Sequence, residues 1–334
     1  MAREAGTTAA TASYVLSGKE GRYISTDMRN RVMAAVATTG YIKSSPASSL
    51  HGKRQGIIAV LVPQFSNQYF TNLMVAIESV VEKQGLSLSI SNTFDDPDRE
   101  RDLVVKMVQQ RVDGYILIPT TAGARSTDPI RKLRVPMVLV DRPLQGASGS
   151  FTEVFPDNYR AGYVLGEHLG QAGHTRVAYL GWDSGFEILD RRREGFWDGL
   201  AAATGKRQRE VSVNGDFPAD GGYRLAERVH REHPDVTAWC LGFNVPARGS
   251  VDYLRDQRIK VGEDLSVVMI GAPDWALVGA NDFTLVDLRP EEMGRTAAER
   301  LLQELSGPQA APARTTVDCL LHAGSSVMDI RNSH

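Results

Sequence analysis

Few residues of this chain stand where a catalytic or metal-binding group would need them. Cys240 and Cys319 each lie in an apolar, strand-like stretch, which predicts buried free thiols rather than a disulfide or a metal site. His230 and His233 are three apart at the end of a predicted helix without a third ligand nearby, so we interpret them as a solvated helix end. No glycine-rich phosphate loop follows a predicted strand. The sequence therefore predicts no enzyme, no cofactor and no metal site.

The distribution of charge indicates a polyanion partner for one end of the chain. The 334 residues have a formal net charge of -2, but residues 1–54 hold eight Lys and Arg against three acids, a net +5, and leave -7 for the remainder. A basic segment on an acidic body is typical of a protein whose basic segment binds nucleic acid. A solvated basic surface is the alternative interpretation.

The first 45 residues have the pattern of short helices without a strand. One helix is predicted to end before Gly6, a second is capped by Thr8 and covers residues 9–17, and a third covers residues 26–36. Three such helices cannot bury a large core, so they form a small module. The Ser-rich residues 44–52 then form a connector.

From residue 56 onward, apolar runs alternate with helical patterns. Residues 57–62 are continuously apolar, as in a parallel strand that is buried on both faces. Further strands are predicted at residues 87–92, 115–119, 137–141, 176–181, 238–241 and 266–270, with helices between them. A helix at residues 291–305 and one strand near residues 316–321 follow. This series predicts an α/β body of two doubly wound lobes with parallel sheets.

The sequence lacks the signals of a membrane or secreted protein. It contains no run of about 18 apolar residues that could span a bilayer. Its N-terminus has neither the charged start nor the apolar stretch of a secretory signal. We therefore expect a cytoplasmic protein without a membrane span.

An ordered set of short motifs resembles the LacI-GalR family of bacterial transcriptional regulators over essentially the whole chain. The matching positions of the head and hinge are residues 2–6, Thr8, Thr11, Ser13, 15–18, Thr26, Arg29, Val32, Ala35, 40–41, Ala47 and Leu50. Those of the body are residues 66–70, 95–97, 112–114, 140–143, 157–162, 173–174, 195–196, 262–268 and 292–294. Each motif alone is weak, but their order along the chain makes the resemblance specific.

The resemblance implies a small all-α helix-turn-helix head at residues 1–43, a hinge at 44–55 and a periplasmic-binding-protein-like α/β body at 56–334. The two lobes of this effector-binding and dimerisation body are then expected at about 56–153 with 286–309, and at about 154–285 with 310–334. The implied function is a homodimeric repressor that binds double-stranded operator DNA. A small molecule, a sugar or a related metabolite, would modulate that binding from the cleft between the lobes.

For the head, the resemblance places the second helix in the major groove. Base reading would fall to Ala9, Ala10 and Tyr14, and phosphate contact to Thr8, Thr11 and Ser13. Alanine can touch a thymine methyl group but cannot make bidentate hydrogen bonds, so we expect weak direct reading or an A·T-rich target. A surface aromatic that packs on the head is the alternative for Tyr14.

For the hinge, the resemblance makes Leu50 of each subunit a wedge between central base pairs in the minor groove. The alternative is a linker residue that docks on the body. The family has Pro-Asn before this helix where the chain has Lys43 and Ser44, and Pro46 lies within the matching stretch. The family pattern also begins several residues before Met1, which favours a true start upstream of it.

For the cleft, the resemblance assigns effector contacts to Tyr69, Phe70, Asp141, Arg192 and Asn244, and Phe217 could stack on the ligand. Each of these residues could instead make an ion pair or a packing contact between the lobes. Two family acceptors for sugar hydroxyls are absent, because Val245 and the pair Gly271-Ala272 stand in their places. The ligand is therefore expected to be a sugar, or a less polar or anionic molecule.

Two other functions stay open from the sequence. An orphan DNA-binding regulator with a vestigial sensor would keep the head and lose the ligand. A periplasmic solute-binding protein would share the two-lobed body, but the head and the missing secretion signal argue against it.

Overall fold

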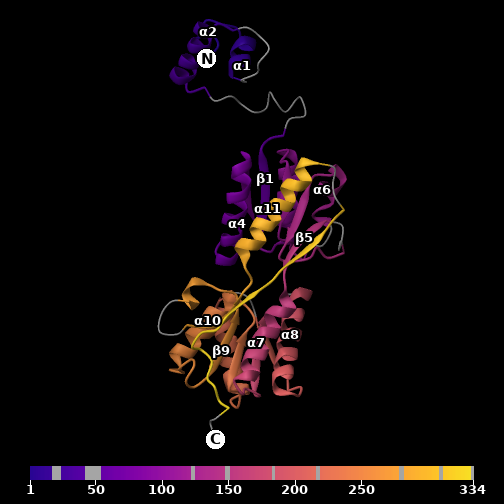
Figure 1. The fold of residues 1–334 in the computed structure, drawn as a ribbon, viewed down its shortest axis with the longest axis vertical. Helices are drawn as coiled ribbons and strands as arrows, with labels where there is room; N and C mark the ends of the chain where they lie inside the picture. Colours follow the sequence, from indigo (N-terminus) through magenta and orange to yellow (C-terminus); the bar gives the residue numbers. More distant parts are fainter. Residues whose placement is uncertain are drawn as a thin grey trace. The chain divides into compact units, whose positions relative to one another are not determined.

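The computed structural model describes residues 1–16, 24–41, 54–121, 125–146, 151–182, 185–215, 219–277, 282–307 and 311–331. Hinge residue Leu50, with Lys43, Ser44 and Pro46, lies outside these ranges, as does Phe217. The chain divides into two compact units, Met1–Gln55 and Gly56–His334 (Figure 1).

The first unit is a small helical module. Helix α1 spans Ala9–Leu16 and helix α2 spans Thr26–Thr39, so both predicted helix starts are confirmed. Before α1, the Ala5 N–H donates to the Met1 carbonyl over 2.9 Å and closes one turn. The buried core of the described part of the unit consists of Ala5, Ala12, Val15, Val32 and Ala35.

Two local signals of this module are confirmed by its hydrogen bonds. Thr8 Oγ1 accepts from the Thr11 N–H over 3.2 Å and thereby caps α1. Gly6 has a φ of +61°, in the left-handed region that glycine adopts without strain, and it ends the first turn. Arg31 of α2 donates from Nη2 to the Ala5 carbonyl over 2.8 Å, so α2 holds that turn in place.

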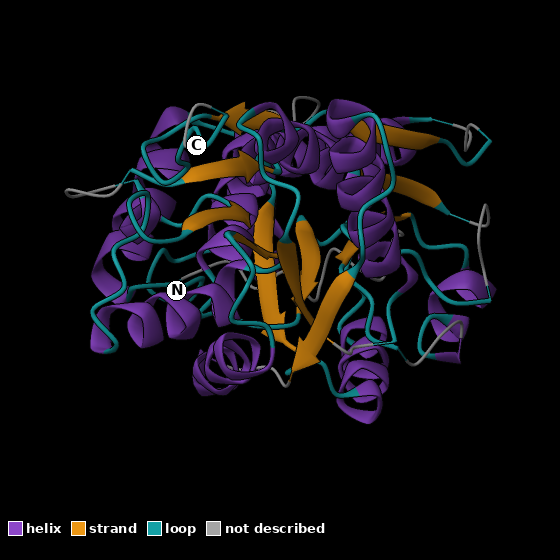
Figure 2. Ribbon diagram, turned by 90° about the horizontal axis from the view of Figure 1, so that it is seen from below, coloured by secondary structure: helices purple, strands orange, loops and turns teal. Residues whose placement is uncertain are grey.

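The second unit contains two sheets with helices packed on them (Figures 1 and 2). The order of the first sheet is β11-β5-β4-β3-β1-β2, with all pairs parallel. Its strands are β1 (Ile57–Val62), β2 (Ser87–Asn92), β3 (Gly114–Leu117), β4 (Met137–Val140), β5 (Thr152–Pro156) and β11 (Arg314–Val317). Its helices are α4 (Gln68–Val81), α5 (Pro97–Gln109), α6 (Asp128–Leu133) and α11 (Pro290–Ser306).

The order of the second sheet is β12-β10-β9-β8-β6-β7, parallel except for the antiparallel pair of β10 and β12. Its strands are β6 (Val177–Trp182), β7 (Val211–Gly215), β8 (Ala238–Leu241), β9 (Ser266–Ile270), β10 (Thr284–Asp287) and β12 (Leu320–His322). Its helices are α7 (Asn158–Gln171), α8 (Glu187–Thr204), α9 (Ala219–Glu232) and α10 (Asn244–Asp256). The two doubly wound lobes predicted from the sequence are therefore confirmed.

The C-terminal stretch corrects the sequence prediction. One strand is expected near residues 316–321, whereas β11 pairs with β5 in the first sheet and β12 pairs with β10 in the second. The last passage between the lobes lies between these two strands, so the expected boundary at residue 310 is wrong. The boundary at residue 153 is also too early, since β5 ends at Pro156 in the first sheet. Pairing partners so distant in sequence leave no trace in a local pattern.

The two cysteines occupy different environments. Cys240 is buried in β8, as predicted. Cys319 lies between β11 and β12 and is only partly buried, because the chain leaves one sheet for the other at this point. Partial burial still raises the pKa of the Cys319 thiol to about 11. Among the described helices, none is long and apolar enough to cross a membrane.

Helices α7 and α8 approach each other more closely than side chains would allow. A Cβ atom at Gly166 of α7 would lie 1.9 Å from the Phe196 carbonyl oxygen of α8. A Cβ at Gly199 of α8 would lie 2.0 Å from the Tyr163 carbonyl oxygen of α7. Glycine is therefore required on both sides of this contact, which joins two helices of the second lobe.

Candidate functional site

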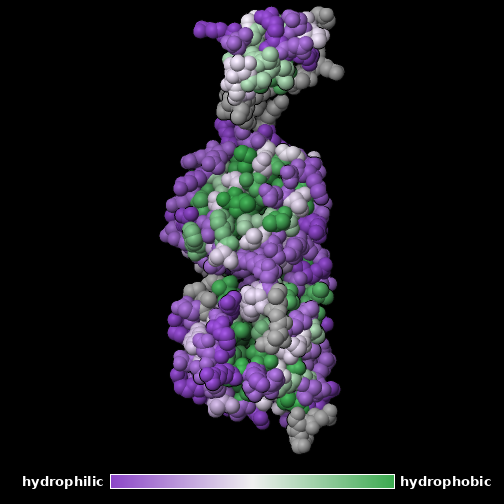
Figure 3. Space-filling model, turned by 90° about the vertical axis from the view of Figure 1, so that its left-hand side faces the viewer, coloured by the Kyte–Doolittle hydropathy of each residue, from purple (hydrophilic) through white to green (hydrophobic). Residues whose placement is uncertain are grey.

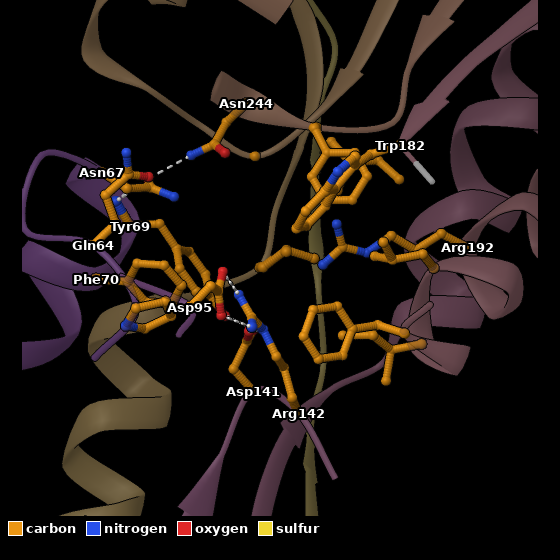
Figure 4. Close-up of a pocket in the computed structure, with 18 residues that line it drawn as sticks. Gln64, Asn67, Tyr69, Phe70, Asp95, Asp141, Arg142, Trp182, Arg192 and Asn244 are labelled. Atoms are coloured by element: carbon orange, nitrogen blue, oxygen red, sulfur yellow. Dashed lines mark hydrogen bonds and ion pairs between the residues drawn. The ribbon is translucent and has the colours of Figure 1, made fainter. Parts of the chain in front are cut away.

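A cavity lies between the two lobes of the body, where strands of both sheets end (Figure 4). Its volume is about 70 Å³. In a doubly wound sheet, the loops after the strands converge at this edge and supply the ligand-binding side chains. The residues that line the cavity are Pro63, Gln64, Asn67, Tyr69, Phe70, Asp95, Asp141, Arg142, Trp182, Phe186, Ile188, Leu189, Arg192, Phe243, Asn244, Ile270, Gly271 and Leu288.

Asn67 caps a helix and joins the lobes at the same time. Its Oδ1 accepts from the Tyr69 N–H over 3.1 Å, which caps α4. The same oxygen accepts from Nδ2 of Asn244, the first residue of α10, over 2.8 Å. A second bond between the lobes runs from the Asp274 N–H to Gln68 Oε1 over 3.0 Å. These side-chain bonds hold the described cleft closed.

Asp141 follows strand β4 with a φ of +68°, a left-handed conformation that aspartate tolerates better than most residues. The residue is 5% exposed. Tyr69 donates from its hydroxyl to Asp141 Oδ1 over 2.6 Å. Burial first, and then the neighbouring Asp141 carboxylate, raise the pKa of Tyr69 well above its usual value. Tyr69 therefore remains a neutral hydrogen-bond donor at every ordinary pH.

Arg142 is bound by carboxylates of its own lobe. Its Nη1 and Nη2 lie 2.6 and 3.3 Å from the two oxygens of Asp95, and its Nε lies 3.5 Å from Asp141 Oδ2. Across the cleft, the guanidinium stacks over the Phe186 ring at 4.2 Å from the ring centroid. The positive charge of Arg142 is thus already balanced by protein groups.

Arg192 lies on the opposite wall, with a different set of partners. It projects from α8 into the cavity (Figure 4) and is 6% exposed. Its Nε donates to Asn158 Oδ1 over 2.5 Å, and its Nη1 lies 3.4 Å from the Gly242 carbonyl oxygen. Its guanidinium stands 5.3 Å from the centroid of the Phe243 ring. These partners are neutral, unlike those of Arg142.

Aromatic rings form much of the wall on the side of the second lobe. Trp182 and Phe243 meet edge to face with their centroids 5.4 Å apart. Trp182 also lies 6.1 Å from Phe186. Such a wall contributes apolar contact area and ring faces for a flat ligand.

The backbone conformation and the close approach of Asn244 explain why position 271 is a glycine. Gly271 has a φ of +100°, and an added Cβ would meet the Asn244 Cβ at 2.9 Å. A side chain that could accept hydrogen bonds from a ligand does not fit there while Asn244 bridges the lobes.

The cavity brings together five of the six residues that the sequence assigns to the effector, namely Tyr69, Phe70, Asp141, Arg192 and Asn244. The sixth, Phe217, lies outside the described residues. Sequence reasoning misses Asp95, Arg142, Trp182, Phe186 and Phe243. Asp95 and Arg142 could have been found, because both belong to motifs of the family resemblance. The three aromatic residues belong to none of these motifs.

In the first unit, one side of α1 is open to solvent. Ala9, Ala10 and Ser13 are exposed, as is the capping residue Thr8. Thr11 and Tyr14 are partly buried. The six residues assigned to DNA therefore lie at or near the surface, whereas Leu50 falls outside the described residues.

Comparison with known proteins agrees with both units. Residues 1–44 match the family of bacterial regulatory proteins, lacI family, and residues 167–327 match a periplasmic binding protein-like domain. The HTH-type transcriptional repressor PurR of Yersinia enterocolitica is 25% identical over 331 residues, which cover 98% of this chain and 96% of that protein. PurR of Mannheimia succiniciproducens is 24% identical over 312 residues, or 93% of this chain and 92% of that protein.

Solved structures share the fold at low sequence identity. A LacI-family regulator from Silicibacter pomeroyi superimposes with a TM-score of 0.82 at 22% identity over 98% of both chains. The Lac repressor dimer bound to operator and the anti-inducer ONPF gives a TM-score of 0.82 at 22% identity, over 98% of this chain and 97% of that one. A LacI-family regulator from Enterococcus faecium with bound ribose gives 0.74 at 23% identity, over 82% of this chain and all of that one.

Proposed function

The chain belongs to the lacI family of bacterial regulatory proteins, and we propose that it is a repressor whose helical head binds operator DNA under the control of a small molecule in the inter-lobe cavity. The chemistry of α1 carries this proposal. Its open side presents the short side chains of Ala9, Ala10 and Ser13, so the helix backbone can approach base edges closely. Thr8 and Thr11 offer hydroxyl groups for phosphate contact.

The closed cavity supports control by a ligand. The described side-chain bonds across the cleft include Asn67 with Asn244 and Gln68 with Asp274. A ligand that contacts both walls changes the balance between closed and open lobes in proportion to its differential affinity for them. A change in lobe closure would then alter the spacing of two heads in a dimer. We propose repression rather than activation because the similar PurR proteins are repressors.

The first lobe offers a surface for homodimer formation. Val75 of α4 and Ile90 of the edge strand β2 are 60% and 41% exposed, on elements that pack against each other. Apolar surface of the first lobe is visible in Figure 3. Exposed apolar residues on adjacent elements are typical of a protein interface. We assign this face to the contact between two copies, each of which supplies one DNA-reading head.

Selection of DNA from a random double-stranded pool tests the function directly. The full chain is expected to enrich one sequence built as an inverted repeat, because a twofold dimer binds two equivalent half-sites. Enrichment of a single asymmetric site would contradict the dimer, and failure to enrich any sequence would contradict the regulator itself.

The selected DNA then separates the contributions of Leu50 and Ala10. Leu50→Ala is expected to raise the Kd by about tenfold or more, because it removes an apolar wedge that holds the DNA kink. Ala10→Gly removes at most a methyl contact and should raise the Kd by less than about threefold. Leu50→Met keeps an apolar wedge and is the matched control, to be measured by fluorescence anisotropy at one salt concentration. A larger effect of Ala10→Gly would argue for the linker interpretation of Leu50.

A further inference from the structure

Arg192 is a buried cation whose described partners are neutral, and from it we infer that the cavity binds a compact aromatic monocarboxylate. This inference rests on the proposed function, since it takes the cavity to be the effector site. It goes further by naming the chemical class of the ligand. The absence of the two family acceptors at positions 245 and 271–272 left the class open from the sequence alone.

The charges of the two walls are not balanced in the same way. On the first lobe, Asp95 and Asp141 both pair with Arg142. On the second lobe, the described contacts of Arg192 are the Asn158 amide oxygen, the Gly242 carbonyl oxygen and the Phe243 ring. Burial of a guanidinium that makes no direct ion pair is costly, and a carboxylate in direct contact offsets that cost with two parallel N–H···O bonds. An anion placed on Arg192 therefore completes the site.

The first wall limits that anion to a single charge. Asp95 and Asp141 supply two negative charges against one from Arg142, so this wall is net negative when all three groups are ionised. A phosphate dianion on Arg192 would face these carboxylates across a cavity of about 70 Å³. A monocarboxylate carries one charge, and its apolar end can lie against the aromatic rings beside Arg192.

The second-lobe wall, on which Arg192 also lies, presents ring faces to a flat apolar ligand. Phe186 and Phe243 both pack on Trp182, with centroid distances of 6.1 and 5.4 Å. Ile188, Leu189 and Leu288 add aliphatic surface to the same lining. Ring stacking and apolar burial would therefore supply most of the affinity, while Arg192 supplies orientation and selectivity.

A sugar fits this lining poorly. Each hydroxyl group of a sugar must find a partner in the cavity or lose the hydrogen bond that it makes with water. The amide of Asn244 already donates to Asn67, and position 271 has no room for a side chain. Two acceptors that would hold sugar hydroxyls are thus absent, and one oxygen of Asp141 is already engaged by Tyr69.

Isothermal titration calorimetry of the full chain at neutral pH tests the inference with benzoate and its neutral isostere benzamide. Benzoate is expected to bind at least about tenfold more tightly than benzamide, because the two differ at the group that meets Arg192. Ribose, glucose and inorganic phosphate should bind more weakly than benzoate. Equal binding of benzoate and benzamide, tighter binding of a sugar or of phosphate, or no binding of benzoate would overturn the inference.

Variants locate the carboxylate. Arg192→Gln should raise the Kd of benzoate at least about tenfold and leave that of benzamide nearly unchanged. The matched control is Arg228→Gln, on the exposed part of α9, where Arg228 pairs with Glu232. A similar loss in both variants would contradict the assignment to Arg192. Comparison of the two ligands on the unaltered chain does not depend on the folding of any variant.

The outcome is separable from that of the proposed function. Calorimetry requires no DNA, and DNA selection requires no ligand. A chain that binds benzoate through Arg192 but enriches no DNA would refute the regulator and keep the ligand class. A chain that enriches an operator and binds ribose more tightly than benzoate would refute the ligand class and keep the regulator.

Discussion

Gly166→Ala is expected to destabilise the second lobe by about 2 kcal/mol or more, although alanine is the better helix former. The added Cβ would lie 1.9 Å from the Phe196 carbonyl oxygen, so α7 and α8 must move apart along their contact. Separation costs more than the roughly 1 kcal/mol that alanine contributes to an exposed helix. Urea denaturation followed by tryptophan fluorescence measures the loss, since all four tryptophans (Trp182, Trp197, Trp239 and Trp275) belong to this lobe.

An exposed position of α8 provides the opposite control. Ala202 is exposed, and Ala202→Gly should lower the free energy of unfolding by about 1 kcal/mol through helix propensity alone. Alanine is thus expected to be favoured at position 202 and glycine at position 166. A Gly166→Ala variant as stable as the unaltered chain would show that the helices can separate without cost, contrary to the packing described.

Operator binding is expected to weaken at least about a hundredfold when the salt concentration rises from 50 to 200 mM. The first 54 residues carry a net charge of +5, and a dimer brings two such segments to the phosphates. Each phosphate that a cation neutralises releases a condensed counterion, so the logarithm of the affinity falls linearly with the logarithm of salt. Fluorescence anisotropy with the selected operator at a series of salt concentrations gives this slope.

A charge variant in the head calibrates the slope. Arg29 is exposed on α2. If it contacts phosphate, Arg29→Gln removes two phosphate contacts from a dimer. It should then reduce the magnitude of the slope of log affinity against log salt concentration by about two. Arg228→Gln removes the same charge from the body and should leave the slope unchanged. A salt response that is flat, or that depends equally on both arginines, would argue against the head as the DNA-binding unit.

The cavity also bears on the alternative of a vestigial sensor. A cavity without a ligand is expected to fill with apolar side chains or to lose its buried charges, because buried charges are costly to keep. Here Arg192 stays 6% exposed with neutral described partners. We therefore favour a sensor that retains a ligand over an orphan DNA-binding protein.

Much of the fold could be predicted because its signals are local. Gly6 and Thr8 mark a turn and a cap through their own conformation and hydroxyl group, and residues 57–62 are apolar because both faces of β1 are buried. These properties act over a few residues, so they can be read along the chain. The split between β11 and β12 could not, because the two strands pair with partners in different sheets.

The same division applies to the site. Residue types and motif order were enough to place Asp141, Arg192 and Asn244 at a cleft in a two-lobed DNA-binding regulator. Only the tertiary structure decided which arginine pairs with carboxylates, because ion pairs depend on distance in space. Asp95 and Arg142 are 47 residues apart in sequence and meet in a bidentate pair, while Arg192 faces neutral groups. That difference is the observation from which we infer a monocarboxylate ligand for the cavity.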